Sequence, residues 1–310
     1  MKTIIIVNPA AGNGNAAKKW NKFKNTAAFP HELLMTQYAG HAEEVAARLR
    51  DADEPVMVIG FGGDGTMREI VAGAAGSPNL IVGSVAAGSG NDFSRGFYSF
   101  KDAEAVELFL QEPASLEQDL GEFIDSELFR FVSSSGIGFD AEISALVNRS
   151  LAKKGLNKVG AGKLVYLLYV IRTLFRFKKF DLAVETDGNN QQFKDVWLAT
   201  VSNQPYFGGG MKISPDSKTG DGLLELTIVS GISRLKLLLV FGTVFTGTHT
   251  RFKEVIQLSG SQFRLTTDRQ VYRHIDGDYA GKSPKNEPIH YGISKSRWNA
   301  INNGKKEDVL

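Results

Sequence analysis

The chain has 310 residues, which is longer than one typical domain, so two domains are expected. Its hydrophobic and charged fractions, 42% and 23%, are those of an ordinary globular protein with a sizeable core. Lys plus Arg number 36 and Asp plus Glu 34, and this near balance gives no indication of a nucleic-acid partner. The absence of cysteine excludes disulfides and thiolate metal sites.

The N-terminus and the apolar runs bear on localisation. Met1 and Lys2 lead directly into a strand-like run, without the pattern of a signal peptide. The longest apolar runs, at 165–171 and 237–245, are too short to span a bilayer. We therefore predict a cytoplasmic protein without a transmembrane span, which contacts a membrane only from the side.

A strand–loop–helix pattern repeats through the first third of the chain. Strands are expected at 2–7, 31–36, 56–59 and 80–85, and helices running toward residue 23, at 41–50 and at 67–75. This alternation predicts an α/β domain with a doubly wound parallel sheet, whose ligands lie outside the carboxyl ends of the strands.

From about residue 116 the pattern changes to short, β-rich segments separated by Gly, Asn and Asp. They lie at 129–134, 181–186, 196–202, 223–229 and 262–267, with helical stretches at 161–177 and 233–245. This predicts a second, mostly antiparallel domain with helices. Residues 302–308 are expected to form a frayed tail.

The stretch Gly62-Gly63-Asp64-Gly65-Thr66 follows a strand and precedes a helix. Glycines in that position let backbone N–H groups and the helix dipole face a phosphate. The carboxylate of Asp64 suits a phosphate site only if a cation or a transferable proton lies between them. Thr66 could cap the helix or bind phosphate. The alternative is a tight turn in which Asp64 bonds its own backbone.

Other nucleotide-binding patterns are weaker. Gly12-x-Gly14-x-x-Ala17 superficially fits the dinucleotide fingerprint, but the second strand ends in Thr36, where a ribose-binding carboxylate is expected. This weighs against a dehydrogenase. The chain has no match to the Walker A motif, and its histidines lack the paired spacing of a zinc site.

Several motifs occur together in one order along nearly the whole chain. They are Asn8-Pro9 with Gly12, Thr36 with Gly40-His41-Ala42, Gly62–Thr66 with Glu69, Gly88-Ser89-Gly90-Asn91-Asp92-Phe93, Gly136-Ile137-Gly138-Phe139-Asp140-Ala141, Asn203 with Tyr206–Gly210, Pro215, Asp221-Gly222, and Asp276-Gly277-Asp278. In this order the chain resembles the bacterial diacylglycerol kinase-like lipid kinases, which share their catalytic domain with sphingosine kinases and, more distantly, with NAD kinases and phosphofructokinases.

The resemblance implies a fold and a domain organisation. Residues 1–120 would form the ATP-binding α/β domain, and residues 121–290 an antiparallel β-sandwich that binds the lipid. Residues 291–310 would return to the first domain. ATP and Mg²⁺ would bind in the cleft between the domains.

The resemblance also assigns site residues. The ATP site would be formed by Asn8, Gly12, Thr36, Gly62, Gly63, Asp64, Gly65, Thr66, Glu69, Ser89 and Asn91. The catalytic carboxylates would be Asp64 with Asp276 or Asp278, and a structural metal would bind Asp221 and the carbonyls of Lys218 and Leu223, oxygen ligands that suit Mg²⁺ or Ca²⁺. Asp92, Arg95 and Asp140 are candidates on the substrate side.

Two positions depart from the family pattern. Ser89 stands where Thr is usual, and it retains the hydroxyl. Asp278 stands where Glu is usual, and its side chain is about one methylene shorter, so the choice of base between Asp276 and Asp278 stays open. The alternative for Asp276-Gly277-Asp278 is a simple hairpin turn.

Other candidates also keep a structural alternative. Asp140 is either a site carboxylate or a helix N-terminal residue that balances the dipole, and Arg95 is either a phosphate ligand or a surface charge. A basic, aromatic stretch from Lys153 to Lys179 could lie on anionic lipid or pack into the core. This stretch includes Lys153, Lys154, Lys158, Lys163, Tyr166, Tyr169, Arg172, Phe175, Arg176, Phe177, Lys178 and Lys179.

We therefore predict an ATP- and Mg²⁺-dependent lipid kinase that phosphorylates a lipid hydroxyl, with diacylglycerol as the leading substrate. Phosphoryl transfer needs positioning, charge neutralisation and a group near the attacking hydroxyl, which glycine loops, Asp64 and a second carboxylate can supply. The alternatives are a kinase of a sphingoid base or ceramide, a kinase of a soluble substrate such as NAD, and a nucleotide-binding regulator without catalysis. The expected location is the inner face of the membrane, and a homodimer is left open.

Overall fold

The computed structural model describes residues 1–149 and 162–302, with backbone alone for 147–149 and 162–168. The predictions for Lys153, Lys154 and Lys158, for the side chains of Lys163 and Tyr166, and for residues 303–308 of the C-terminal tail lie outside this description. The chain divides into two compact units. The first comprises Met1–Leu120, Gly208–Gly210 and the chain from Ser294 onward, and the second comprises Gly121–Phe207 and Met211–Ile293.

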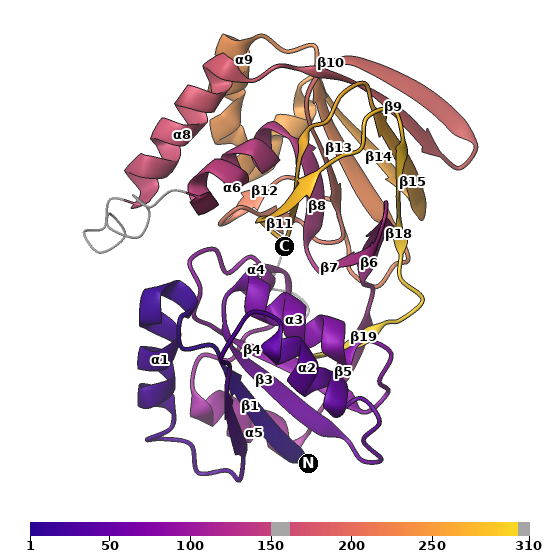
Figure 1. Cartoon of the computed structure of the whole chain (residues 1–310). Helices are drawn as coiled ribbons and strands as arrows, with labels where there is room; N and C mark the ends of the chain where they lie inside the picture. Colours follow the sequence, from indigo (N-terminus) through magenta and orange to yellow (C-terminus); the bar gives the residue numbers. More distant parts are fainter. Residues whose placement is uncertain (150–161, 303–310) are drawn as a thin grey trace. The chain divides into compact units, whose positions relative to one another are not determined.

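The first unit is built on one sheet with the strand order β2-β1-β3-β4-β19-β5. Its strands are β1 (Lys2–Val7), β2 (Glu32–Met35), β3 (Val56–Gly62), β4 (Leu80–Ala86), β5 (Ser115–Gln118) and β19 (Trp298–Ile301). Its helices are α1 (Ala11–Phe23), α2 (His41–Arg48), α3 (Asp64–Ala74), α4 (Phe93–Gly96) and α5 (Ala103–Gln111). All neighbouring strands are parallel except β5, which is antiparallel to β19 (Figure 1).

Helices cover both faces of this sheet because its central strands are apolar on both sides. On one face, Ile5 of β1 and Met57 of β3 share a core cluster with Trp20 of α1 and Phe109 of α5. On the other face, Gly60 leaves room for Met67 of α3, whose sulfur would lie 2.5 Å from a Cβ at that position. The predicted doubly wound sheet is confirmed.

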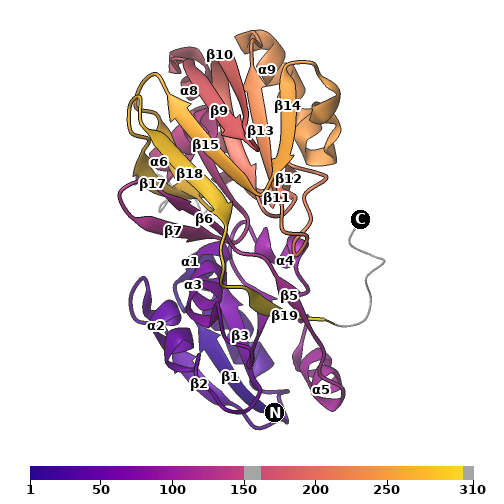
Figure 2. The ribbon, with the colours of Figure 1, turned by 90° about the vertical axis from the view of Figure 1, so that its right-hand side faces the viewer.

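The second unit is an antiparallel sheet with the strand order β17-β16-β8-β10-β9-β15-β18-β6-β7, in which β13 joins β10 to β14 (Figure 2). Its strands are β6 (Gly121–Ile124), β7 (Leu128–Phe131), β8 (Ser134–Gly138), β9 (Phe180–Thr186), β10 (Asn189–Ser202), β13 (Leu224–Ser230), β14 (Val255–Gly260), β15 (Gln262–Thr267), β16 (Tyr272–Ile275), β17 (Asp278–Lys282) and β18 (Pro288–Ile293). A separate small ribbon pairs β11 (Tyr206–Phe207) with β12 (Met211–Lys212).

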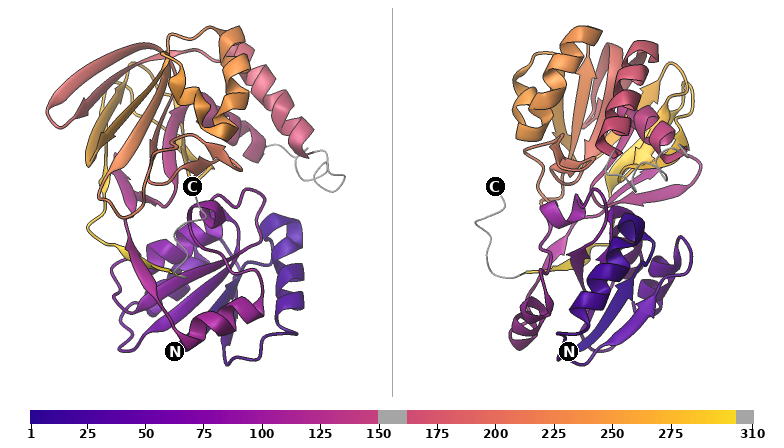
Figure 3. Two further views of the ribbon diagram at one scale, coloured as in Figure 1. Left: turned by 180° about the vertical axis from the view of Figure 1, so that it is seen from behind. Right: turned by 90° about the vertical axis from the view of Figure 1, so that its left-hand side faces the viewer.

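The helical elements of this unit are α6 (Phe139–Arg149), α8 (Gly162–Arg176), α9 (Arg234–Phe241), and the 3₁₀ turns η2 (Gly242–Thr246) and η3 (Thr248–Arg251). The helices α6, α8 and α9 lie together on one side of the strands (Figures 1 and 3). Their buried faces join the sheet core: Phe139, Leu174 and Leu237 belong to the same hydrophobic cluster as Trp197 of β10. The predicted antiparallel, β-rich domain with helices is confirmed.

Three of the predicted boundaries that were wrong have an identifiable physical reason. The helix expected from Met67 begins at Asp64, because Gly63 is extended and the helical hydrogen bonds start at its carbonyl oxygen. The strand expected at 129–134 is two strands, because Asp276 occupies the N–H groups of Val132 and Ser133. The helix expected at 233–245 ends at Phe241 and continues as η2.

Candidate active site

The predicted nucleotide motifs of the first unit meet at the carboxyl ends of β1, β3 and β4. Asn8, which follows β1, donates its backbone N–H to Phe61 of β3 at 3.0 Å. Ala87, which follows β4, donates its N–H to Gly62 at 2.9 Å. Parallel register therefore brings loops that are distant in sequence to one edge of the sheet, where ligands of such folds bind.

Glycines let these loops touch backbone to backbone. A Cβ at Gly88 would lie 2.3 Å from the Cα of Gly63, a distance that side chains do not tolerate. Gly12 has φ +58°, and a Cβ there would lie 2.3 Å from the carbonyl oxygen of Ala87. These contacts require glycine at both positions, and glycine-rich turns of this kind are where backbone N–H groups bind polyanions in other proteins.

Asp64 stands at the head of α3. Its Oδ1 accepts a hydrogen bond from the N–H of Phe93 at 2.8 Å, which links the loop after β3 to the loop after β4. A Cβ at Gly90 would lie 2.7 Å from Asp64 Oδ2, so the absence of a side chain there makes room beside the carboxylate. A fixed, half-buried carboxylate in a glycine-lined cradle is a donor set that fits a hydrated divalent cation.

Neighbouring polar groups hold the same loops. Asn8 Nδ2 donates to Thr66 Oγ1 at 3.0 Å, so Thr66 contacts the first loop. Asn91, at φ +57°, accepts from the N–H of Gly88 at 2.8 Å and closes the loop that carries Ser89. Ser89 itself is exposed on this loop. Thr36 follows β2, and its N–H donates to Val7 at 2.9 Å. Gly65 lies in the first turn of α3.

Glu69 has an identifiable structural role. Its Oε1 accepts from the N–H of Gly40 at 2.9 Å and its Oε2 from that of Ala42 at 3.2 Å. The carboxylate thus caps the N-terminus of α2 with negative charge and joins α3 to α2. A contact between Glu69 and a nucleotide stays a prediction.

Asp92 and Arg95 form a second polar cluster in the first unit. The buried carboxylate of Asp92 accepts from the N–H groups of Gly209 and Gly210, each at 2.7 Å, and pairs with Arg95 at 3.0 Å. Burial raises the pKa of Asp92, and its hydrogen bonds oppose that rise. Arg95 also donates to the carbonyl oxygen of Gly90. These contacts fix the loop after β4, and a direct contact with substrate stays a prediction.

In the second unit, Asp276 and Gly277 form a two-residue hairpin turn between β16 and β17. Both have positive φ, 46° and 86°, as a type I′ turn requires. The carboxylate of Asp276 accepts from the N–H groups of Val132, Ser133 and Ser134 at 2.8–3.0 Å. Asp278, the first residue of β17, is exposed. The two candidate bases therefore differ: Asp276 anchors the turn, whereas Asp278 faces solvent.

Asp140 contacts residues of two strands that flank β8. Thr200 of β10 and His274 of β16 both pair with Gly136 of β8. Asp140 Oδ2 accepts from Thr200 Oγ1 at 2.9 Å and from His274 Nε2 at 3.1 Å. A Cβ at Gly136 would lie 2.8 Å from that oxygen, so only glycine leaves room for the cluster. Asp140 is thus both in the first turn of α6 and part of a buried polar network.

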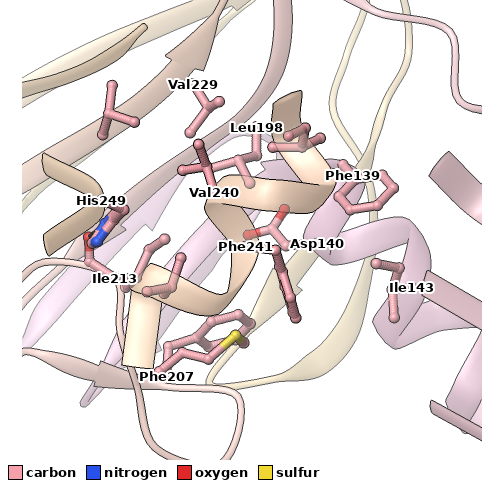
Figure 4. Close-up of a pocket in the computed structure, with 14 residues that line it drawn as sticks. Phe139, Asp140, Ile143, Leu198, Phe207, Ile213, Val229, Val240, Phe241 and His249 are labelled. Carbon is pink, nitrogen blue, oxygen red and sulfur yellow. Dashed lines mark hydrogen bonds between the residues drawn. The ribbon is translucent and has the colours of Figure 1, made fainter. Parts of the chain in front are cut away.

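An apolar pocket adjoins this network in the second unit (Figure 4). It is lined by Phe139, Asp140, Ile143, Leu198, Phe207, Met211, Ile213, Val229, Leu237, Val240, Phe241, Val244, His249 and Val255. His249 Nε2 bonds the carbonyl oxygen of Ile213 at 3.1 Å, and burial lowers the pKa of this histidine. His249 is therefore neutral at pH 7, and Asp140 is the acidic group of the lining.

The predicted metal site lies in the turn before β13. Asp221 is exposed, and its Oδ1 accepts from the N–H of Leu223 at 3.0 Å, while Lys218 lies on the same exposed stretch. Across residues 1–149 and 162–302, no group of three or more acidic or histidine side chains is placed to hold a metal ion. The site at Lys218, Asp221 and Leu223 stays a prediction.

Sequence reasoning missed Thr200, His274 and His249. Thr200 and His274 meet Asp140 only through the register of three strands, and no local motif reports that register. His274 does stand two residues before Asp276, and this position beside a predicted site was the available signal.

Two family models match the chain. Residues 2–122 match the diacylglycerol kinase catalytic domain, and residues 133–293 match the YegS C-terminal NAD kinase beta sandwich-like domain. The chain belongs to the diacylglycerol kinase family. The first match contains the loops around Asp64, and the second contains Asp140, Asp276 and Asp278. The protein is accordingly a kinase of the lipid kinase family, which uses ATP.

Relatives match over nearly their full length. YtlR of Bacillus subtilis, a lipid kinase-like protein, is 30% identical over 291 residues, which are 90% of this chain and 94% of YtlR. A diacylglycerol kinase of Mycobacterium tuberculosis is 27% identical over 290 residues, 91% and 90% of the two chains.

Solved structures share the fold. A diacylglycerol kinase-like protein of Bacillus anthracis has a TM-score of 0.74 at 22% identity, covering 98% of this chain and 95% of its own. Yeast NADH kinase, in complex with NADH, has a TM-score of 0.54 at 11% identity, covering 98% and 84%. In the part of this diacylglycerol kinase family member that the structure describes, no helix is long and apolar enough to cross a membrane.

Proposed function

We propose that the protein transfers the γ-phosphoryl group of ATP to the hydroxyl of diacylglycerol, with Mg²⁺, at the inner face of the membrane. The observation that carries the choice of a lipid is the pocket of the second unit. Its lining is apolar apart from Asp140 and the neutral His249. Alkyl chains gain about 0.8 kcal/mol for each buried CH₂ group, so such a lining favours an acyl chain.

The same pocket weighs against a dinucleotide acceptor. Adenine, ribose and nicotinamide carry polar groups that need hydrogen-bond partners when they are buried. Among the lining residues, His249 uses Nε2 for Ile213, and Asp140 uses Oδ2 for Thr200 and His274. Although the fold resembles that of NADH kinase, the lining of this pocket lacks the polar groups that a dinucleotide would need.

In the proposed reaction, the acceptor oxygen forms a bond to the γ-phosphorus, the bond from phosphorus to the β,γ-bridging oxygen breaks, and ADP leaves with that oxygen. The proton of the alcohol passes to a carboxylate. We assign this role to Asp278, because Asp276 would first have to release three backbone N–H groups. General-base catalysis of this kind contributes about 10²–10⁴-fold in rate.

Asp64 and the glycine loops would serve the phosphates. When bound, Mg²⁺ supplies charge neutralisation at the triphosphate. The N–H of Phe93 holds the carboxylate of Asp64 in position, and the hydrogen bond from Asn8 to Thr66 joins the loop after β1 to the start of α3. The N-terminus of α3 directs its backbone dipole toward the same place.

Incubation with radiolabelled ATP and a panel of acceptors tests the proposal. The panel is diacylglycerol, ceramide and sphingosine in detergent micelles, and NAD in solution, with products separated by thin-layer chromatography. We expect label in phosphatidic acid and none in NADP. Label in NADP, or in the sphingoid products alone, would replace the proposed substrate.

A further inference from the structure

Six of the eight residues of helix α9 are apolar, although the helix lies at the surface, and the other two, Arg234 and Lys236, bond to other elements. Its eight residues, Arg234–Phe241, include Leu235, Leu237, Leu238, Leu239, Val240 and Phe241. Leu237 and Val240 are buried and line the pocket. Leu235 and Leu239, one helical turn apart, are 71% and 72% exposed. A helix with so few polar residues is normally covered by protein or by lipid.

The exposed apolar side chains extend onto neighbouring elements. Phe245 of η2 is 50% exposed, and Phe175 of α8 is 67% exposed. The two helices lie side by side in Figures 1 and 3, and Arg234 of α9 donates hydrogen bonds to the carbonyl oxygens of Leu174 and Phe177. We name as the α8–α9 surface Ile171, Arg172, Phe175, Arg176, Leu235, Leu238, Leu239 and Phe245.

The charges on these elements have one sign. Residues 162–180 contain five basic residues and no acidic one, and residues 231–253 contain four basic residues and no acidic one. Acidic side chains of other elements pair with Lys179 and Lys236, through Asp195 and Glu254. Among the described residues, Arg172 and Arg176 are exposed and have no acidic partner.

We propose that the α8–α9 surface is the face by which the second unit docks on an anionic lipid bilayer. The docking proposal rests on one part of the proposed function, namely that the substrate is a lipid. Exposed leucines and phenylalanines bordered by unpaired arginines match an interface in which apolar side chains enter the acyl boundary and cations meet phosphate headgroups. A protein partner would need acidic groups to meet these arginines, and no other feature of the described residues indicates such a partner.

The position of the pocket agrees with this orientation. Leu235 and Leu239 lie on the exposed side of α9, and Leu237 and Val240 line the pocket on the other side. A docked α9 would therefore be the single layer between the bilayer and the apolar pocket. A lipid chain could then pass around one helix into the pocket without entering water. The hydrophobic effect favours such a path, because it removes apolar surface from water.

Vesicle flotation of the full chain, without nucleotide, tests the surface. Vesicles of phosphatidylcholine are compared with vesicles that also contain phosphatidylglycerol. We expect binding to the anionic vesicles, weakened by added salt. Leu235→Gln with Leu239→Gln should weaken binding at least about tenfold. Arg172→Gln with Arg176→Gln should weaken it by about fivefold for each charge.

Matched controls separate docking from general surface polarity. Leu108→Gln with Leu128→Gln alters two leucines that are 60% and 50% exposed on α5 and β7 and are not part of the α8–α9 surface. This pair should bind vesicles like the unsubstituted protein. A tryptophan placed by Leu239→Trp should shift its emission to the blue on anionic vesicles, since the three native tryptophans are already buried.

Kinase turnover on diacylglycerol in detergent micelles should be unchanged in the leucine and arginine variants, because none of those residues lines the pocket. Equal vesicle binding by the α8–α9 variants and the unsubstituted protein would overturn the proposal. So would a dimer in sedimentation equilibrium that Leu235→Gln dissociates, because a second copy would then cover the surface. Vesicle binding requires no substrate turnover, so a wrong lipid substrate would leave its result intact.

Discussion

Asp64 allows a test in which charge changes and shape does not. In Asp64→Asn, the amide oxygen can still accept from the N–H of Phe93, so the loop contact at 2.8 Å is retained. The negative charge is lost, and with it the attraction for a cation. We expect kcat to fall by about 10²-fold or more, with an unchanged melting temperature.

The matched control for this variant is Asp102→Asn. Asp102 caps α5 by accepting from the N–H of Ala105 at 3.0 Å, so it makes the same kind of contact at a helix N-terminus. It should keep full turnover. Equal losses in both variants would indicate that helix capping, and not a site charge, explains the effect of Asp64.

Substitution of the two hairpin carboxylates, Asp276 and Asp278, should affect stability and turnover differently. Asp276→Asn replaces one acceptor oxygen by an NH₂ group facing backbone N–H groups, which should destabilise the protein by about 1–3 kcal/mol. Asp278→Asn alters an exposed side chain and should leave the denaturation midpoint unchanged while turnover falls about 10²-fold. Full turnover in Asp278→Asn would remove it as the base.

Among the secondary-structure elements, features that depend on local sequence could be predicted, whereas features that depend on the register of distant strands could not. The buried run of β1 and the glycine turn after β3 were readable because apolar periodicity and glycine spacing are local properties. The division of 129–134 into β7 and β8 was not, because it depends on Asp276, more than 140 positions away in the chain. The cluster of Asp140, Thr200 and His274 was hidden for the same reason, since three strands must first align on Gly136.

The pocket under α9 predicts a dependence on chain length. Val229 of β13 lines it, and Val229→Phe would occupy part of the space that we propose for the acyl chain. Each CH₂ group excluded from the pocket costs about 0.8 kcal/mol, or about fourfold in affinity. We expect KM for long-chain diacylglycerol to rise at least about tenfold, while KM for dioctanoylglycerol stays nearly constant.

The short-chain substrate serves as the internal control for that variant. Overpacking can destabilise a core by about 1–3 kcal/mol, so the melting temperature is measured alongside. An equal rise of KM for both substrates, with a stable fold, would show that the pocket does not hold the acyl chain.

At the scale of the whole molecule, the first unit is assembled from segments at both ends of the sequence. The chain leaves it after Leu120 and re-enters it at Ser294, whose N–H donates to the carbonyl oxygen of Leu120 at 2.8 Å. β19 then pairs with β4 in parallel and with β5 in antiparallel register. The sheet that carries the proposed phosphate-binding loops is therefore complete only when β19 has joined it.

Trp298 connects this late strand to the candidate site. Its indole N–H donates to the carbonyl oxygen of Asp119 at 3.2 Å, and its ring lies 5.9 Å from that of Phe93 and 5.0 Å from that of Phe97. Phe93 in turn donates its N–H to Asp64. Trp298→Ala should cost about 3–5 kcal/mol of unfolding free energy and weaken ATP binding in calorimetry, because the support behind Phe93 is lost.

Trp197→Ala is the control for that prediction, because the two tryptophans are alike in burial and bonding. Trp197 is fully buried in the second unit, and its indole N–H donates to the carbonyl oxygen of Ile232 at 2.9 Å. Its removal should cost a similar unfolding free energy, yet leave ATP affinity intact at temperatures where the protein stays folded. If both variants lose ATP affinity alike, the effect of Trp298 reflects general loss of stability, and the connection from β19 through Phe93 to Asp64 is refuted.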